Sequence, residues 1–564
     1  MNRKKTMITI MAIALIACFV MPCFGSGGQS APAARTGVDP LLNPTGLPIA
    51  KEKVTLSFAA CRPASRKNDM KDMPVFQDFE RLTNVNISWI EIEEAVWNEK
   101  TRLMLASSDL PDAFWSWPIP DNVVMEYGSQ GILIPLEGLI ENYGHNMNRG
   151  MQEVPTLRSI MTFTDGHIYA VPMVNMAPAS VQNIMWLNME WLAQARMNVP
   201  KTTEELYNTL KTFKTLYPNT TPFTFMQYDP GGIVHYQHSA RSMFGSFGVA
   251  YDVRYLMIQP DGTLVYAPSL PGYLEGLRYF NRLYAEGLLD PESFSQTLDQ
   301  MTAKSKTETG VGLTISHMLN PIHDFGEKPE GYIQTIDDFR TARYQPLPPL
   351  AGPSGNQSIW MKWIPGPGDN SGRFMITNVC KHPEIALRWV DLLCDSAEHS
   401  NTVRNGPQGI GWDYVDGGRW RVIEYSEQLA NPLFDPDLTN HPSNYSVWWW
   451  LPSWAAKRVM DPSVQHQIEN NPIYSPFMID PPPNVKFTPQ EADRLSTIQV
   501  DLFRYTASSY TNFILNGVTN AQWNEYLTRL RNYGMDTYVQ LYKTAIDRSG
   551  ISFGNIQSFH LPNN

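Results

Sequence analysis

The sequence predicts an α/β fold, in which helices cover the faces of a mostly parallel β-sheet. Near its start, residues 54–60 (VTLSFAA) form a predicted strand, a helix follows Pro74, residues 85–89 alternate apolar with polar side chains, and 97–106 form a second helix. This strand–helix alternation is typical of α/β proteins. The 564 residues allow two large lobes. A total of 16 Trp, 25 Tyr and 24 Phe suits a surface that grips a flat ligand.

The first predicted helix begins with proline and ends at an asparagine. Pro74 is placed at the first helical position, where its missing N–H costs nothing, and Asn84 ends the helix. Val75, Phe79 and Leu82 fall on one helical face, which we expect to be buried.

Later helices are predicted from capping residues and apolar spacing. Thr202-Thr203-Glu204-Glu205 has the form of a capping box, and Thr488-Pro489-Gln490-Glu491 combines a capping box with proline at the first position. Pro383 opens another helix. Amphipathic spacing predicts three more, at residues 273–286, 523–530 and 536–547.

The charge balance argues against nucleic acid as a partner. The net charge is −11, and after Arg3, Lys4 and Lys5 no basic tract follows. Binding that neutralises phosphates needs clustered lysine and arginine. The same absence disfavours anionic lipid as a direct target.

Residues 1–25 have the layout of an export signal. A basic start precedes an apolar run from Met7 to Met21, which is too short for a spanning helix, and small residues follow. We therefore expect an exported chain, in the cell envelope or periplasm. Residues 26–52 are predicted to be a flexible tether.

Processing of the signal has three interpretations. A lipid anchor on Cys23 or on Cys18 is favoured, and simple cleavage after Gly25 is the alternative. Only Cys61, Cys380 and Cys394 lie beyond the signal, which is too few for a disulfide framework.

Several phrases, in order along nearly the whole chain, resemble the extracellular solute-binding proteins, family 1, of bacterial ABC importers, in particular their long lipoprotein-like members. The phrases lie at residues 75–90 (VFQDFERLTNVNISWI), 106–114 (ASSDLPDAF), 131–143 (GILIPLEGLIENY), 165–172 (DGHIYAVP), 186–206, 381–393 (KHPEIALRWVDLL) and 488–548.

The resemblance implies a type II periplasmic-binding fold with two discontinuous α/β lobes and a ligand cleft between them. We expect the first lobe at residues 53–172 plus 373–480 and the second at 173–372 plus 481–564. The implied function is non-catalytic capture of a carbohydrate, in particular an oligosaccharide, by closure of the two lobes. The implied working form is a monomer that serves a membrane permease and a cytoplasmic ATPase. The chain has no GxxxxGK[ST] loop and cannot itself be that ATPase.

Sugars offer apolar faces and a rim of hydroxyls, so their sites combine aromatic rings with fixed polar groups. In the loop 114–118, Trp115 matches the place where related sugar-binding proteins have a cleft-facing tryptophan, and Trp117 lies beside it. Arg62 and Ser65 follow the first strand, where ligands gather in open α/β sheets. Further candidates are Trp186, Tyr228, Asp229, Tyr236, Trp360, Trp412 and Trp449. For an average tryptophan, a buried core position is the competing interpretation.

Three consecutive tryptophans, residues 448–450, cannot all face one way on a helix or strand. We expect at least one to face a ligand or the other lobe and at least one to lie in the core.

No metal, cofactor or catalytic signature is predicted. His235 and His238 lack a third zinc ligand, and residues 216–221 lack the acidic residues of the calcium loop found in many long relatives. The alternatives left open are a secreted carbohydrate-active enzyme, which needs two carboxylates across a cleft, and the same fold binding a peptide or serving a sensor.

Overall fold

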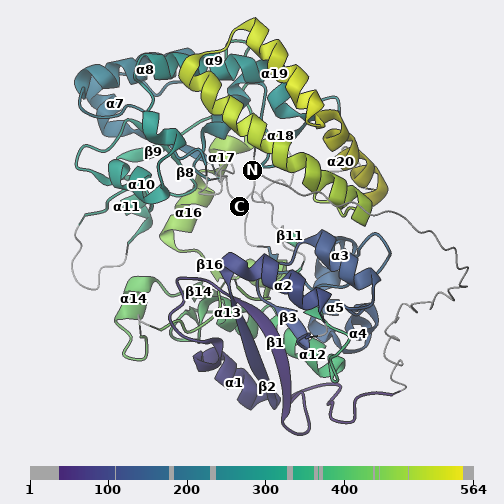
Figure 1. Ribbon diagram of the computed structural model, residues 1–564. Coiled ribbons are helices and arrows are strands. Elements are labelled where there is room, and N and C mark those ends of the chain that lie inside the picture. The colour runs from purple at the N-terminus through teal and green to yellow at the C-terminus, as the bar shows by residue number, and fades with distance from the viewer. Residues whose placement is uncertain are drawn as a thin grey trace, which may run out of the picture. The chain divides into compact units, whose positions relative to one another are not determined.

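Two separate groups of hydrophobic cores organise the chain. The computed structural model describes residues 37–107, 109–176, 183–228, 237–326, 334–360, 366–367, 372–435, 438–443, 445–479 and 482–550. One group of cores takes residues between 42 and 174 and between 374 and 454, and we call this part lobe A. The other takes residues between 184 and 359 and between 473 and 546, and we call it lobe B. Figure 1 shows lobe A below and lobe B above.

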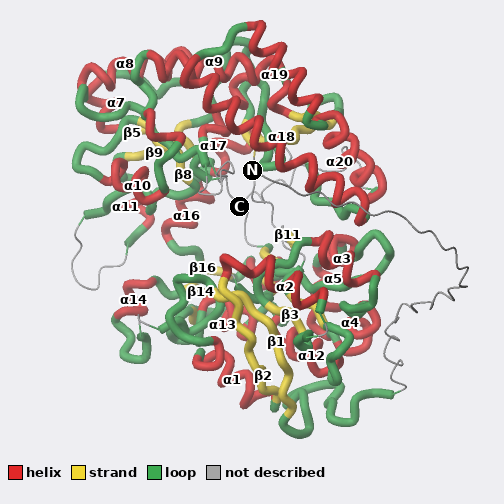
Figure 2. The backbone as a smooth tube through the Cα atoms, viewed as in Figure 1, coloured by secondary structure: helices red, strands yellow, loops and turns green. Residues whose placement is uncertain are grey.

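Lobe A is centred on a four-stranded sheet in the order β12-β3-β1-β2. Strand β1 (Val54–Arg62) is parallel to β2 (Val85–Glu93) and to β3 (Ala113–Trp115), and β12 (Phe374–Ile376) is antiparallel to β3. Since β12 comes from a distant part of the sequence, lobe A is discontinuous. Figure 2 shows the long strands β1 and β2 in yellow with helices around them.

The remaining lobe A elements surround this sheet. Its helices are α1 (Pro74–Thr83), α2 (Trp97–Ala106), α3 (Asp121–Ser129), α4 (Glu137–Tyr143), α5 (His145–Glu153), α6 (Thr156–Met161), α12 (Pro383–Leu393), α13 (Glu398–Asn405), α14 (Tyr425–Leu429) and α15 (Pro452–Ala455). A second sheet joins β13 (Trp412–Tyr414), β14 (Trp420–Val422) and β16 (Arg458–Val459). A third joins β4 (Val174–Asn175), β11 (Gly366–Pro367) and β15 (Trp449–Trp450).

The predicted tether ends earlier than expected. Leu42, Ile49 and Ala50 are buried in the core of lobe A, and the Asp39 carboxylate lies 2.6 Å from Nδ1 of His382 at the start of α12. The apolar side chains of this segment are the reason, because they gain by leaving water. The segment 38–50 therefore belongs to lobe A and is not a free tether.

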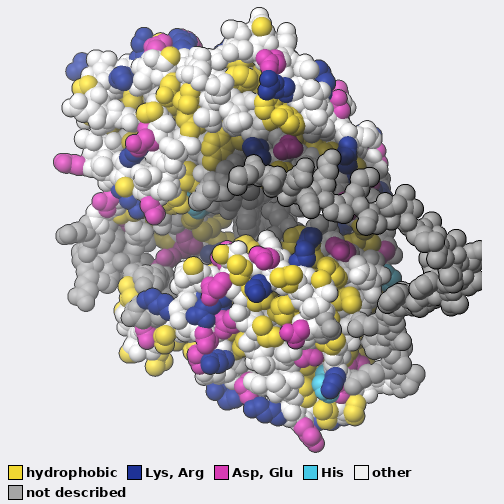
Figure 3. All heavy atoms as spheres, viewed as in Figure 1, with side chains coloured by type: hydrophobic (Ala, Val, Ile, Leu, Met, Phe, Trp, Pro, Cys, Tyr) yellow, Lys and Arg dark blue, Asp and Glu magenta, His cyan; other side chains and the backbone are white. Residues whose placement is uncertain are grey.

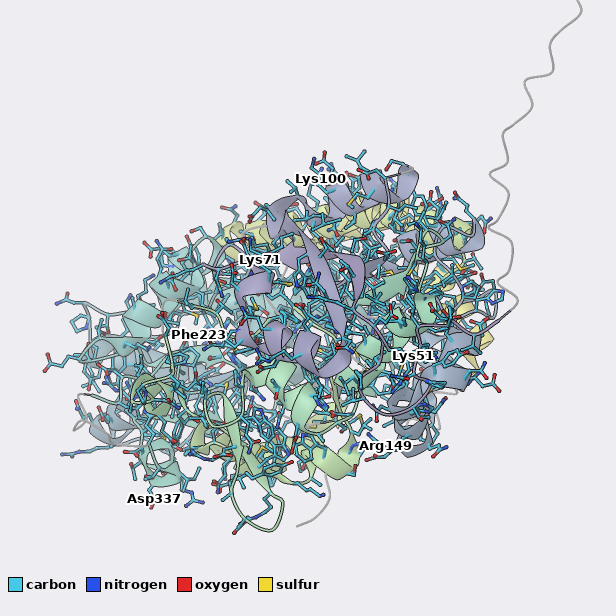
Figure 4. All side chains as sticks on the ribbon, turned by 90° about the horizontal axis from the view of Figure 1, so that it is seen from below. Lys51, Lys71, Lys100, Arg149, Phe223 and Asp337 are labelled. Carbon is cyan, nitrogen blue, oxygen red and sulfur yellow. The ribbon has the colours of Figure 1, made fainter. Side chains whose placement is uncertain are left out.

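Lobe B has small antiparallel sheets within a largely helical body. Its main sheet has the order β8-β5-β9, from Leu313–Ser316, Ile184–Asn188 and Tyr344–Leu347, and β6 (Leu256–Ile258) pairs with β7 (Leu264–Tyr266). Its helices are α7 (Met189–Ala195), α8 (Thr203–Leu216), α9 (Pro271–Ala285), α10 (Leu298–Lys306), α11 (Ile336–Arg340), α16 (Pro462–Glu469), α17 (Asn471–Tyr474), α18 (Pro489–Asn516), α19 (Asn520–Asn532) and α20 (Met535–Ser549). Phe223, labelled in Figure 4, lies fully buried in this lobe.

Residues 462–479 pack with lobe B, although the sequence analysis assigns them to the first lobe. His466 of α16 stacks on Trp186 with ring centroids 5.9 Å apart, and β17 (Met478–Ile479) pairs with β10 (Ile359–Trp360). The boundary within this part of the chain is therefore near residue 461.

Short 3₁₀ helices complete the fold. They are η1 (Met70–Asp72), η2 (Glu94–Val96), η3 (Ala240–Phe247), η4 (Ala267–Ser269), η5 (Pro291–Phe294) and η6 (Ser475–Phe477).

An ion pair joins the lobes beside the start of α18. Lys486 Nζ donates to Oδ2 of Asp121 on α3 at 2.6 Å and lies 4.4 Å from the ring centroid of Phe163. At this point the two lobes are in direct contact.

Candidate ligand-binding site

The tryptophan that the family resemblance singles out lies in the core of lobe A. Trp115, on β3, has no exposed surface, and its ring centroid lies 5.2 Å from Trp89, 5.7 Å from Phe76 and 6.1 Å from Trp389. A ring enclosed in this way has no face for a ligand. The expectation for Trp115 is therefore corrected: it packs the sheet against α1 and α12.

Trp117 has a different environment because the strand breaks between the two tryptophans. Ser116 has a φ of +118°, a value that is uncommon for a non-glycine residue. In a regular strand, residues 115 and 117 face the same side, but here Trp117 leaves the core around Trp115, packs against the second core of lobe A and is partly exposed. Its ring stacks on Tyr445 at 4.8 Å, with the Arg373 guanidinium 5.7 Å from the ring centroid.

The three consecutive tryptophans divide between two sides of their strand. Trp449 enters the core of lobe A, where its indole N–H donates to the Pro172 carbonyl at 2.9 Å, whereas Trp448 and Trp450 enter a separate cluster. Trp449, the ring proposed for the ligand, is the core residue, and Trp448 and Trp450 are 1% and 3% exposed, so a ligand-facing tryptophan among the three stays a prediction. Its neighbours are the candidates instead.

Five tryptophans of lobe A gather around two arginines, and we call this group the Trp–Arg cluster. Arg404 lies 5.4 Å from the ring centroid of Trp448 and 5.9 Å from that of Trp450. Arg458 lies 5.3 Å from Trp450 and 5.8 Å from Trp420. The members are Trp412, Trp420, Trp448, Trp450, Trp454, Arg404 and Arg458.

Trp412 belongs to this cluster but is itself fully enclosed. It has no exposed surface, and its indole N–H lies 3.3 Å from the Thr402 hydroxyl. We assign it a supporting position, in contact with Trp454 at 6.4 Å between ring centroids.

The cluster has an unusual electrostatic environment. Burial, together with the neighbouring Arg458 guanidinium, lowers the pKa of Arg404 to about 10. His441 lies near Arg404, and burial together with this cation lowers its pKa to about 3. Arg458 pairs with Asp461 at 3.2 Å, while the Arg404 Nη1 donates to the Ser443 hydroxyl at 3.0 Å.

Several hydrogen-bond donors of the cluster remain unused. The indole N–H groups of Trp448, Trp450 and Trp454 find no acceptor among the described residues, and the Nε–H groups of Arg404 and Arg458 likewise find none there. Buried donors without a partner are uncommon in proteins and each needs an explanation.

Sequence reasoning named Trp412 and Trp449 but missed both arginines. A signal was available, because six tryptophans between residues 412 and 454 are flanked by Arg404 and Arg458. Spacing alone does not show that these two side chains meet the rings.

The loop after the first strand is partly occupied by internal ion pairs. Arg62 Nη1 donates to Oδ1 of Asp69 at 2.6 Å, and its guanidinium lies within 4 Å of Glu91 and Glu93. Ser65 is exposed in the following turn. Sequence reasoning missed Arg66, which is 5% exposed and pairs with Glu91. Arg62 therefore stabilises this loop through ion pairs within lobe A.

Two predicted aromatic residues of lobe B are structural. Trp186 on β5 is 1% exposed, and its indole N–H donates to the Ser316 carbonyl at 3.0 Å. The Tyr228 hydroxyl donates to the Ala507 carbonyl at 2.7 Å, and burial raises its pKa. Trp186 is therefore enclosed, whereas Tyr228 is partly exposed and its hydroxyl is already bonded within the protein. Asp229 and Tyr236 lie outside the described residues, as do Cys18 and Cys23.

Trp360 is the lobe B candidate with polar surroundings. It is 7% exposed, its indole N–H has no acceptor within the described parts of the chain, and the Arg241 guanidinium lies 4.6 Å from its ring centroid. Nearby, burial and the adjacent His238 lower the pKa of His317 to about 4. Lobe B thus offers a second pairing of an indole with a buried arginine.

The basic side chains outside these clusters are dispersed. Lys51, Lys71 and Lys100 lie on separate parts of lobe A in Figure 4, and Figure 3 shows acidic and basic side chains interspersed on the visible face. No helix within the described ranges is long and apolar enough to cross a membrane. No group of three or more His, Cys, Asp or Glu residues suited to a metal ion occurs in the part of the chain that the structure describes.

Comparison with known proteins identifies the fold. No family model matches the chain. The fructooligosaccharide ABC transporter substrate-binding protein FusA of Streptococcus pneumoniae is 25% identical over 525 residues, which cover 88% of this chain and 91% of that protein. The polygalacturonan/rhamnogalacturonan-binding protein YtcQ of Bacillus subtilis is 20% identical over 432 residues, or 76% of this chain and 77% of that protein.

Among solved structures, FusA of S. pneumoniae as an EF-hand mutant in complex with fructo-nystose has a TM-score of 0.74 at 24% identity, covering 88% of this chain and 99% of that one. An extracellular solute-binding protein from Bifidobacterium longum subsp. infantis has a TM-score of 0.73 at 19% identity, covering 89% and 99%. The predicted α/β fold class is confirmed. The chain therefore has the fold of extracellular solute-binding proteins and is a homologue of the substrate-binding proteins of ABC transporters.

Proposed function

We propose that this chain is the extracytoplasmic substrate-binding component of an ABC importer, and that it captures an oligosaccharide without altering it. The observation that carries the proposal is the similarity to FusA over 88% of this chain and 91% of that protein, because a match of this extent includes both lobes. Relatives with this fold include solved complexes with fructo-nystose and with kestose.

The chemistry of the described side chains fits such a ligand. Trp117 is partly exposed beside the buried Arg373 guanidinium, and Trp360 pairs with Arg241 in lobe B. An aromatic ring covers the apolar face of a sugar, and a fixed donor pairs with its hydroxyls. One stacked ring is worth about 1 to 3 kcal/mol, so two or three rings support micromolar binding.

Lobe closure would couple capture to delivery. The chain would alternate between an open and a closed arrangement of lobes A and B, and the ligand would favour the closed one by binding both lobes at once. The lobes that would move are those predicted from the sequence, with three changes: residues 38–50 are added to the first lobe, strands β4 and β11 belong to the first lobe, and residues 462–479 belong to the second.

The partners follow from this role. We propose a membrane permease with a cytoplasmic ATPase as the receiving machinery, and a monomer as the working form. A lipid on Cys23 or Cys18 would hold the protein at the outer face of a membrane.

Titration calorimetry on the purified full-length protein tests the proposal. We expect heat and a thermal shift with at least one member of a panel that includes kestose, nystose, oligogalacturonides and short peptides, with a dissociation constant in the micromolar range, about 8 kcal/mol. Mass spectrometry should recover the ligand unchanged. Shortened product would favour the enzyme alternative, and binding of peptides alone would favour the peptide-binding one.

A Trp117→Ala variant tests the proposed stacking ring. We expect affinity to fall by about tenfold or more, because one ring face is lost. Tyr533→Ala, which removes a 38% exposed ring at the end of α19 in lobe B, is the matched control and should leave affinity unchanged. Equal affinities in both variants would contradict the role of Trp117.

A further inference from the structure

The Trp–Arg cluster is rich in unused donors. The three indole N–H groups and the two Nε–H groups that find no acceptor within the described ranges can only donate hydrogen bonds. A neutral sugar hydroxyl both donates and accepts hydrogen bonds, and its O–H donor finds no acceptor among groups that can only donate. A carboxylate only accepts, at two oxygens with about four lone-pair sites, and it uses donors of this kind fully.

Arg404 differs from two other arginines of lobe A, whose positive charges are paired with carboxylates. Arg421 pairs with Glu427 at 2.6 Å, and Arg458 pairs with Asp461. For Arg404, the described residues supply two tryptophan rings and a hydrogen bond to the Ser443 hydroxyl, and no carboxylate among them forms an ion pair with it.

Among the described residues, the charged groups that act on Arg404 are cationic, and His441 beside it is neutral. Burial together with the Arg458 guanidinium lowers the pKa of Arg404, and burial together with Arg404 in turn lowers the pKa of Arg373. Burial beside Arg404 keeps His441 in its neutral form. The acidic groups of the cluster, Asp461 and Glu424, face Arg458. Burying a cation without an opposite charge among the described residues costs free energy, so binding of an anion would stabilise Arg404.

We propose that the captured saccharide is acidic, and that one of its carboxylates binds the Arg404 guanidinium with the indole N–H groups of Trp448 and Trp450. The inference rests on the proposed function and names its substrate class, a uronate-containing oligosaccharide. The arginine receives the carboxylate, and the indole N–H groups beside it supply further donors. Arg404 keeps part of its side chain exposed, so an entering ligand can reach it.

The test compares two forms of one sugar. Calorimetry on the full-length protein is run with an oligogalacturonide and with its methyl ester, which has the same rings and linkages but no charge. We expect the acid to bind at least tenfold more tightly than the ester, and the difference to shrink at high salt, because salt screens the ion pair. A short oligoalginate tests a second uronate, and kestose tests a neutral sugar.

Variants locate the carboxylate. Arg404→Gln should remove the preference for the acid over the ester, whereas Arg404→Lys, which retains the charge, should keep most of it. Arg529→Gln is the matched control, because this arginine is 54% exposed and pairs with Glu525 on α19 of lobe B. A thermal melt of each variant shows that it is folded, and the lysine variant keeps the test valid if the glutamine variant is unstable.

Each outcome decides one claim. Equal binding of acid and ester, or binding of kestose with neither uronate, overturns the acidic-ligand inference and leaves oligosaccharide capture standing. A preference for acid that survives in Arg404→Gln overturns the assignment to Arg404. Absence of binding by every saccharide, or binding of acidic peptides alone, overturns both this inference and the proposed function.

Discussion

Two tryptophan-rich regions of lobe A have similar composition and different roles. In the core under the sheet, Trp89, Trp115 and Trp389 pack with Phe58, Phe76 and Phe79, with ring centroids 4.7 to 6.4 Å apart. In the Trp–Arg cluster, the rings lie at comparable distances from one another, and guanidinium groups lie over them. The core has no such cation over its rings within the described residues.

One feature separates the Trp–Arg cluster from the core. An unpartnered indole alone does not, because Trp115 in the core also lacks an acceptor among the residues described. The difference is the buried charge, which a core avoids and a ligand site can use. Removing members of each region should therefore affect different properties.

Trp389→Ala should give the largest loss of stability. The side chain is 1% exposed and contacts the rings of Phe58, Phe79 and Trp115. Its truncation should lower the free energy of unfolding by about 3 to 5 kcal/mol. Denaturant unfolding measures this effect. Calorimetry on the remaining folded protein should give unchanged affinity, and a strong loss of affinity would contradict the separation of the two regions.

His441→Gln should alter how stability depends on pH. Because the folded-state pKa of His441 is about 3, against about 6.5 when unfolded, the unfolded chain binds more protons between these values. The wild-type protein therefore loses stability as pH falls through this window, and the variant should lose about 1 to 3 kcal/mol less.

Urea unfolding at several pH values between about 7 and 4 measures the difference. His323→Gln serves as the comparison in lobe B, because burial lowers that pKa to about 4 and gives the same sign. Parallel pH profiles of wild type and His441→Gln would refute the assignment of a neutral histidine beside Arg404.

Trp450→Phe should have the smallest effect on stability and still affect binding. Most of the buried ring area is retained, so the free energy of unfolding should change by less than about 1.5 kcal/mol. The indole N–H is lost, and we expect about tenfold weaker binding of an acidic saccharide, as for one hydrogen bond to a charged group. Trp420→Phe is the control, since its N–H donates within the protein, to the Trp454 carbonyl at 3.0 Å. If both variants bind alike, the N–H of Trp450 makes no contact with the ligand.

Local signals predicted the longer helices of the described residues and the first two strands, β1 and β2. Pro74 begins α1 and Asn84 caps it in a left-handed conformation, and Thr488 forms a complete capping box with Glu491 at the start of α18. These features depend on residues a few positions apart, so the sequence contains all the information. Within α1, however, Leu82 is 37% exposed, and Phe76 takes a buried position in its place.

The site was predicted less well because it depends on residues far apart in the sequence. Trp115 is enclosed by Trp389, which lies on α12 and is brought to β3 by a strand that follows lobe B. Whether a strand position faces the core or a ligand depends on such a partner, and local spacing does not reveal it. The positive φ of Ser116, which separates Trp115 from Trp117, has no sequence signal either.

Helix α18 has a mechanical consequence. Its 28 residues rise about 42 Å, and its far end is fastened to α9, where the Asn281 amide donates to the Ile514 carbonyl. The near end adjoins the Lys486–Asp121 ion pair. Leu495, Ile498 and Leu502 in its near half are buried in the lobe B core, so α18 moves with that lobe. A rotation of lobe B by about 10° about the far end of the helix would carry the near end by roughly 7 Å, enough to break the ion pair.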